Sequence, residues 1–153
     1  MSQQYQHILV PVDGSQEAEF AFKKAVQMAK DNENAQLMIT HVVDTQIIQT
    51  GDNGAYEEQL REDIITQGKA LLTSYESHAK AHNLPHVKSI LEYGSPRLQI
   101  CESLPDLYAT DLIVIGATGR SAMERLFLGS VTEYVVRHAP CDVLVVRSDP
   151  DKA

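Results

Sequence analysis

Leu112-Ile113-Val114-Ile115-Gly116-Ala117-Thr118-Gly119 is the stretch of this sequence that decides the fold. Its four apolar residues, 112–115, are typical of a buried strand, and glycines after a strand let the backbone approach a ligand closely. Nine residues further on, Gly129-Ser130 opens a helix-like segment that runs from Val131 to His138. Because backbone N–H groups at a helix start attract anions, the two segments predict a phosphate cradle at the carboxyl end of a strand.

Two common phosphate-binding loops do not match this stretch. A P-loop requires a lysine directly before the Ser or Thr, whereas Gly129 precedes Ser130. The segment 116–119 also lacks the spacing of the dinucleotide fingerprint. The pattern therefore indicates a phosphate site of another kind.

The bulk composition fits one globular domain over residues 1–153, with a core at about 5–147. The chain has 43% apolar and 22% charged residues, and its length is enough to bury a core. No apolar run approaches the roughly 18 residues of a membrane span, and the amino terminus has neither the basic start nor the apolar stretch of an export signal. We therefore expect a cytoplasmic protein with no membrane insertion.

The formal net charge of −8 disfavours nucleic acid and acidic lipid as partners, since both require a basic face. It does not exclude a nucleotide, because a helix start and a few amides act locally. Cys101 and Cys141 lie among apolar residues, and we expect them to be reduced packing residues rather than a disulfide or redox pair.

Strand and helix patterns alternate along the whole chain. The strand-like runs are 7–12, 36–43, 87–93, 111–115 and 142–147. Helical periodicity follows a cap at Ser15, recurs from about Tyr56 to His82, and starts again after Gly94-Ser95-Pro96. We expect a loop over 44–54 and a helix end or kink near Leu104, because Pro105 follows it.

Continuous Val/Ile/Leu strands separated by helices predict an α/β fold, a single doubly wound five-stranded parallel sheet with helices on both faces. For the strand order 3-2-1-4-5, the ligand crevice lies between strands 1 and 4, beyond their carboxyl ends. The loops Pro11-Val12-Asp13-Gly14 and Gly116-Ala117-Thr118-Gly119 then face each other across that crevice.

Two residues at strand ends are candidates for nucleoside contact. Asp13 could accept hydrogen bonds from a ribose diol or help to hold a divalent ion, and its alternative role is to cap the following helix. Val42 could pair with an adenine edge through its main chain, and its alternative role is core packing.

The predicted cradle combines close backbone approach with hydroxyl groups and amides. Gly116 and Gly119 permit the approach, and the hydroxyls of Ser130 and Thr132 lie near the amides of Gly129, Ser130 and Val131, although helix capping is an alternative for both hydroxyls. Arg120 and Arg125 could reach a phosphate or remain solvated loop charges.

Other titratable residues give weaker signals. His78 and His82 are four residues apart on a helix and could chelate a metal, but no third ligand is evident, which favours a solvated helix face. His138 is expected to complement a helix dipole. We assign no catalytic residue, because hydrolysis requires more than the one crevice carboxylate, Asp13, that can be placed.

The chain resembles the universal stress protein family, in its nucleotide-binding form. The resemblance covers nearly the whole length and lies in the segments 8–15, 41–42, 94–96, 111–116 and 129–132. The family's ATP-binding pattern (Gly, two residues, Gly, nine residues, Gly, then Ser or Thr) is intact in this chain.

This resemblance implies a Rossmann-like, adenine nucleotide alpha hydrolase-like fold and an ATP site with Mg²⁺ or another divalent cation. It places Pro11, Val12 and Asp13 along the adenosine, with Asp13 on the ribose and the backbone of Val42 on adenine. The residues that it places around the phosphates, or that the glycine pattern adds there, are Gly116, Thr118, Gly119, Arg120, Gly129, Ser130, Val131 and Thr132.

Association is predicted independently from the last strand. In the order above strand 5 is an edge, and its segment 143–146 is apolar, which a soluble protein rarely leaves unpaired. We expect a homodimer through Asp142-Arg147, as in the family; the alternative is a monomer whose carboxyl-terminal tail covers the edge.

The leading hypothesis is a homodimeric, ATP-binding regulatory module of the stress response that acts on an unknown protein partner. One alternative is a slow ATPase or autophosphorylating enzyme with Ser130 or Thr132 as acceptor. The others are a binder of another adenine nucleotide, such as AMP or a cyclic dinucleotide, and a partner-binding protein that needs no nucleotide.

Overall fold

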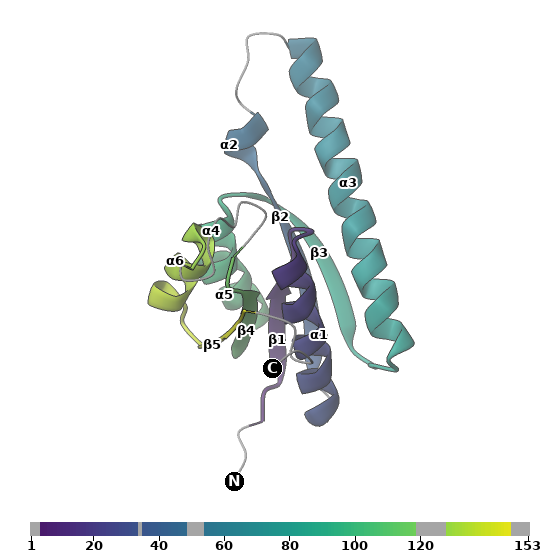
Figure 1. The fold of residues 1–153 in the computed structure, drawn as a ribbon, viewed down its shortest axis with the longest axis vertical. Helices are drawn as coiled ribbons and strands as arrows, with labels where there is room; N and C mark the ends of the chain where they lie inside the picture. The colour runs from purple at the N-terminus through teal and green to yellow at the C-terminus, as the bar shows by residue number, and fades with distance from the viewer. Residues whose placement is uncertain (1–3, 34, 49–53, 119–127, 148–153) are drawn as a thin grey trace.

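The computed structural model describes residues 4–33, 35–48, 54–118 and 128–147. Within them the strands form one all-parallel five-stranded sheet in the order β3-β2-β1-β4-β5 (Figure 1). The strand bounds are β1 His7–Pro11, β2 Gln36–Asp44, β3 Val87–Gly94, β4 Leu112–Gly116 and β5 Asp142–Val146. The predicted α/β class and strand order are confirmed.

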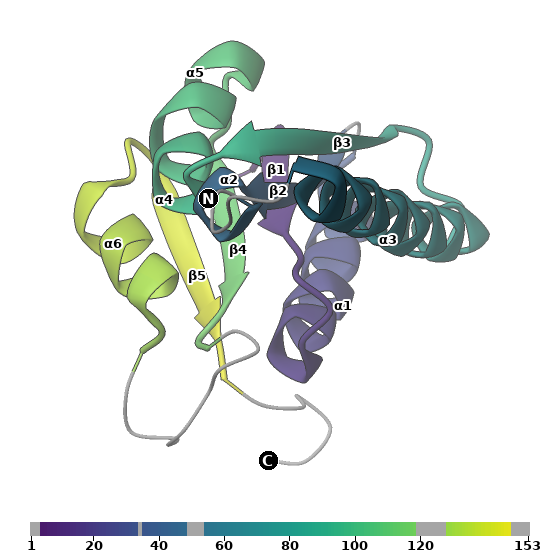
Figure 2. The ribbon, with the colours of Figure 1, turned by 90° about the horizontal axis from the view of Figure 1, so that it is seen from above.

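Helices cover both faces of the sheet, as Figure 2 shows from above. The helix bounds are α1 Gln16–Asp31, α2 Thr45–Ile48, α3 Gly54–Ala81, α4 Pro96–Leu98, α5 Leu104–Tyr108 and α6 Ser130–His138, with a π-helical segment, Gln99–Ser103, between α4 and α5. The helices α1 and α3 pack on one face, whereas the α4–α5 segment and α6 pack on the other.

Each face has its own apolar core because alternate residues of every strand point to opposite sides. On the α1/α3 face, Val10 and Val114 pack with Phe22. On the other face, Leu9 and Ile113 pack with Val135 of α6. The central strands β1 and β4, covered on both faces, are therefore almost entirely apolar and buried, which is why they read as continuous hydrophobic runs.

The helix α3 is only partly supported by the sheet, and its amino-terminal half extends beyond it (Figure 1). Its buried residues are Gly68, Leu72 and Ala79, all in the second half. No helix within the described ranges is long and apolar enough to cross a membrane.

One local prediction was wrong, and a second was wrong in part. Part of the expected loop over 44–54 is regular, since β2 continues to Asp44 and α2 follows directly. Pro105 does not end the helical stretch at Leu104, because it occupies the first turn of α5, where a missing N–H costs little. The preceding π-helical turn, in which Leu104 N–H donates to the Gln99 carbonyl, carries the chain into α5.

Candidate functional site

The site begins in the loop between β1 and α1, at the carboxyl edge of the sheet. Asp13 Oδ1 accepts a hydrogen bond from Ser15 N–H at 3.0 Å, and Ser15 Oγ accepts one from Ala18 N–H at 3.2 Å. Ser15 is thus the helix cap, as predicted. Asp13 instead closes a turn with one carboxylate oxygen and keeps lone pairs for a further donor.

Gly116, the last residue of β4, packs directly against the first turn of α1. A Cβ atom there would lie 2.9 Å from the carbonyl carbon of Glu17 and 3.0 Å from the nitrogen of Ala18. Both neighbours are backbone atoms that cannot rotate away. The glycine that we predicted for ligand approach is therefore also required by helix–sheet packing.

Glu17 reaches from the first turn of α1 into the loop after β4. Its Oε2 accepts hydrogen bonds from Thr118 N–H at 2.8 Å and from Thr118 Oγ1 at 2.9 Å. The Glu17 carboxylate thus occupies two hydrogen-bond donors of the predicted phosphate cradle. Sequence reasoning missed Glu17, because a first-turn acidic residue reads as complementing the helix dipole.

The start of α6 is tied to the same loop by two hydrogen bonds. Gly129 N–H donates to the Ala117 carbonyl at 2.7 Å, and Thr132 Oγ1 donates to the Gly116 carbonyl at 2.7 Å. Thr132 is only 4% exposed, so its hydroxyl hydrogen serves the fold. Ser130 is exposed, Gly129 is the N-cap of α6, and Val131 packs against the core of that face.

Val42 lies where β2 extends past its neighbour β1. The β1–β2 register ends at Pro11 and Thr40, and Val12 N–H adds a bond to the Thr40 carbonyl at 2.8 Å. Since alternate residues of a strand direct their N–H and C=O groups to the same side, those of Val42 also point to the β1 side. They do so beyond the end of the β1 ladder, on the side where the chain continues from Val12 to the partly exposed Asp13.

His41 supports the same loop and was not singled out from the sequence. Its Nδ1 lies 2.7 Å from the carbonyl oxygen of Val12, so the ring donates to the residue that precedes Asp13. Nothing in a lone histidine at a strand end distinguishes this role from ordinary packing.

The structure thus gathers Pro11, Val12, Asp13, Val42, Gly116 and Thr118 with Gly129–Thr132 at the carboxyl edge of the sheet. Gly119, Arg120 and Arg125, also named from the sequence, lie outside the described residues. In the described part of the chain, no group of three or more His, Cys, Asp or Glu side chains could hold a metal ion by itself.

The two cysteines are free thiols, with Cys101 buried and Cys141 partly buried. Burial raises the pKa of Cys101, and burial with the nearby Asp111 and Asp142 raises the pKa of Cys141 to about 11. Both thiols therefore stay protonated near neutral pH, which suits packing rather than nucleophilic chemistry.

Comparisons with known proteins agree with this arrangement. The sequence pattern of the universal stress protein family matches residues 4–147. The chain belongs to the universal stress protein family. A Staphylococcus haemolyticus protein that carries the universal stress protein name is 42% identical over 145 residues, which are 95% of this chain and 86% of that protein.

Solved universal stress protein structures share the fold. Universal stress protein UspA from Lactobacillus plantarum is 34% identical, with a TM-score of 0.84, over 95% of this chain and 100% of that one. A universal stress protein solved in complex with cAMP is 28% identical, with a TM-score of 0.68, over 95% of this chain and 98% of that one. The family therefore includes proteins that bind adenine nucleotides.

Proposed function

We propose that this universal stress protein is a regulatory module that binds ATP at the carboxyl edge of the sheet, between the β1 and β4 loops. The observation that carries this proposal is the contact of Glu17 with Thr118, in which one carboxylate oxygen accepts from both an amide and a hydroxyl. The loop after β4 therefore presents donors that bind an anion, and a phosphate oxygen has the same requirement.

The nucleoside would lie between Asp13 and Val42. Asp13 has lone pairs left for ribose hydroxyls, and the main chain of Val42 points past the end of β1. The cAMP complex of a relative supports an adenine nucleotide as the ligand class. The phosphates would follow toward Gly116 and Thr118, with the segment Gly129–Thr132 also contributing; Gly119 and Arg120 stay predicted phosphate ligands from the sequence pattern.

A divalent cation, Mg²⁺ in the first instance, would accompany the phosphates. Asp13 supplies hard carboxylate oxygen of the kind that Mg²⁺ prefers, and the remaining ligands would come from phosphate oxygens and water. When bound, the ion neutralises phosphate charge; the chain's own residues bind and orient the nucleotide.

The proposal can be tested by changing Glu17, because its carboxylate and a phosphate require the same hydrogen-bond donors of Thr118. We expect Glu17→Gln to tighten ATP binding by roughly fivefold, since removing one like charge near the phosphates is worth on the order of 1 kcal/mol. Adenosine, which has no phosphate, should bind both proteins equally. Isothermal titration calorimetry with Mg²⁺ present measures both ligands.

Glu19→Gln is the matched control, because Glu19 lies on the same helix, pairs with Lys23 at 3.8 Å and carries the same charge. Its ATP affinity should stay close to that of the wild type. If Glu17→Gln and Glu19→Gln tightened ATP binding equally, the effect would be one of net charge alone. If ATP bound no more tightly than adenosine to the wild type and to both variants, a phosphate cradle would be contradicted.

We also propose a homodimer through the outer edge of β5. Ala117 N–H donates to the Val146 carbonyl, so even-numbered residues of β5 face β4 and Val145 directs its N–H outward. Val145→Pro removes an outward donor and leaves the β4 ladder intact. Light scattering should give a dimer for the wild type and a monomer for this variant; a monomeric wild type would contradict the interface.

A further inference from the structure

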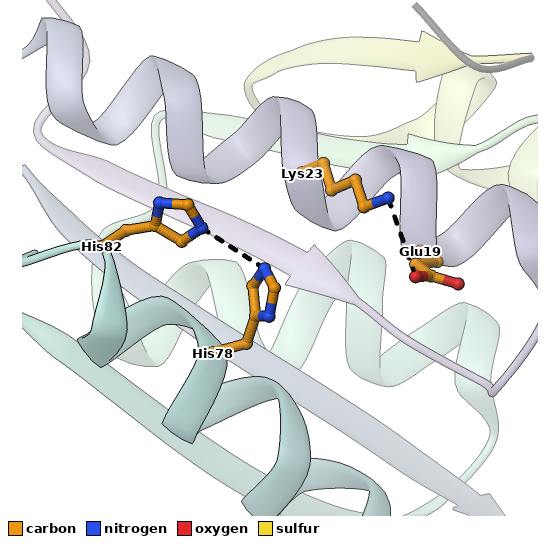
Figure 3. Close-up of polar contacts among 4 residues, drawn as sticks. All are labelled: Glu19, Lys23, His78 and His82. Atoms are coloured by element: carbon orange, nitrogen blue, oxygen red, sulfur yellow. Dashed lines mark hydrogen bonds and ion pairs between the residues drawn. The ribbon is translucent and has the colours of Figure 1, made fainter.

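Two histidine rings meet at the carboxyl-terminal end of α3, far from the nucleotide site. His78 lies on the last turns of α3 and His82 directly follows the helix, and both side chains are exposed. Their Nε2 atoms are 3.3 Å apart, and Figure 3 shows the two rings turned toward each other. The ring centroids are 5.0 Å apart.

This spacing is the one that two imidazole ligands of a single zinc ion require. Zn–N bonds of about 2.0–2.1 Å at a tetrahedral angle place the two nitrogens roughly 3.3–3.4 Å apart. Two histidines four residues apart on a helix are a known way to reach this geometry, and His82, one residue past the end of α3, keeps its side chain on the same face as His78.

Both rings contact residues of α1, His78 through packing and His82 through a hydrogen bond. The ring of His78 lies edge-on to Phe22, with centroids 5.7 Å apart, and Phe22 is only 1% exposed. His82 Nδ1 lies 3.2 Å from Nζ of Lys30, the basic residue in the last turn of α1. The contact with Phe22 thus orients the His78 ring, which lowers the cost of ordering it around an ion.

The contact with Lys30 also determines which ring nitrogen of His82 carries the proton in the metal-free pair. A lysine ammonium only donates, so His82 Nδ1 accepts and its proton resides on Nε2, from which it is donated to His78 Nε2. Partial desolvation, followed by the charges of Lys30 and His78, lowers the pKa of His82.

The geometry points to a two-imidazole site, His78 with His82, for a borderline divalent transition metal ion of the Zn²⁺ class. On binding, the His82 proton moves from Nε2 to Nδ1, both Nε2 lone pairs turn to the ion, and the Lys30 ammonium leaves Nδ1. Water completes the coordination, because the described residues place no third His, Cys, Asp or Glu there. Imidazole suits zinc, nickel and copper, whereas magnesium and calcium prefer oxygen ligands.

The test is competition for Zn²⁺ between untagged full-length protein and a chromophoric chelator. His78→Gln and His82→Gln should each bind the ion at least about tenfold more weakly, because losing a direct ligand costs no less than losing an outer-shell partner. His86→Gln is the matched control, an exposed histidine on the same end of the molecule, and should leave the affinity unchanged.

Lys30→Gln sharpens the test, because it removes the cation that binding must displace; it should tighten Zn²⁺ binding while leaving Mg²⁺ binding unchanged. Thermal unfolding gives a second readout: Zn²⁺ should raise the midpoint of the wild type more than that of His78→Gln. Equal Zn²⁺ affinity in the wild type, His78→Gln and His82→Gln would overturn the proposal, as would weaker binding in Lys30→Gln.

Discussion

The end of β4 and the middle of α3 both depend on a glycine, but the two glycines face different kinds of neighbour. A Cβ atom on Gly116 would meet backbone atoms of α1, whereas one on Gly68 would meet the side chains of His41, at 2.9 Å, and Leu91, at 3.0 Å. Side chains can rotate and backbone in a helix cannot. The difference teaches that α1 is positioned by main-chain fit and α3 by adaptable packing.

The largest expected effect is that of Gly116→Ala. Overpacking against an immobile helix turn should lower the free energy of unfolding by about 3 kcal/mol, the upper end of the usual range. Urea denaturation measures it, with Gly54→Ala as control, because no heavy atom lies within 4 Å of a Cβ at Gly54. Similar losses of unfolding free energy in Gly116→Ala and Gly54→Ala would contradict a specific packing requirement at the end of β4.

Thr132→Val tests the other hold on the same strand end. The substitution keeps the shape but leaves the Gly116 carbonyl without the hydroxyl donor at 2.7 Å, at a cost of about 1–2 kcal/mol. Thr73→Val is the control, since the Thr73 hydroxyl bonds the Lys69 carbonyl on an exposed helix face. Chemical denaturation of both variants should separate them; equal stabilities would show that the buried bond contributes nothing.

Gly68→Ala tests whether α3 is positioned as rigidly as α1. Alanine gains about 1 kcal/mol of helix propensity over glycine. This offsets the displacement of Leu91 and a shift of the His41 ring against its 2.7 Å bond to the Val12 carbonyl. The net change in unfolding free energy should stay below about 1 kcal/mol. A loss as large as that of Gly116→Ala, measured in the same urea series, would contradict adaptable packing of α3.

The smallest effect concerns the polar contact between α3 and β3. Lys80 at 2.8 Å and then the Ser89 hydroxyl lower the pKa of Glu76 below its usual 4.5. A lowered folded-state pKa stabilises the protein above the unfolded value, and that gain disappears as pH falls through the folded value. Glu76→Gln should therefore cost about 0.5 kcal/mol at neutral pH and less near pH 3. A difference that does not shrink on acidification would exclude this ionic contribution.

Much of the fold could be predicted from the sequence because its signals are strong and local. In β1, β2, β4 and β5 an apolar run borders on a Gly, Pro or Asp residue that marks one end of the strand. Ser15 caps α1, as its position suggests. The π-helical turn before Pro105 could not be predicted, since it depends on how the whole α4–α5 segment packs on the sheet.

The candidate site was predictable in its position but not in its contacts. Its glycine spacing marked the end of β4, yet the sequence does not show that Gly116 also faces α1 or that Glu17 accepts from Thr118. Both depend on the distance between α1 and β4, which side-chain pattern alone does not encode. The 3.3 Å approach of His78 and His82 likewise depends on the ring positions that Phe22 and Lys30 impose.

The hold on residues 116–118 comes from both layers of helices at once. Glu17 ties Thr118 to α1 on one face, and Thr132 ties Gly116 to α6 on the other. A ligand that accepts hydrogen bonds from Thr118 in place of Glu17 would remove this contact with α1 and leave the contact of Thr132 with Gly116 intact. Exchanging one anion for another on Thr118 would thus change how residues 116–118 are held on the α1 side of the sheet and leave their contact on the α6 side unchanged.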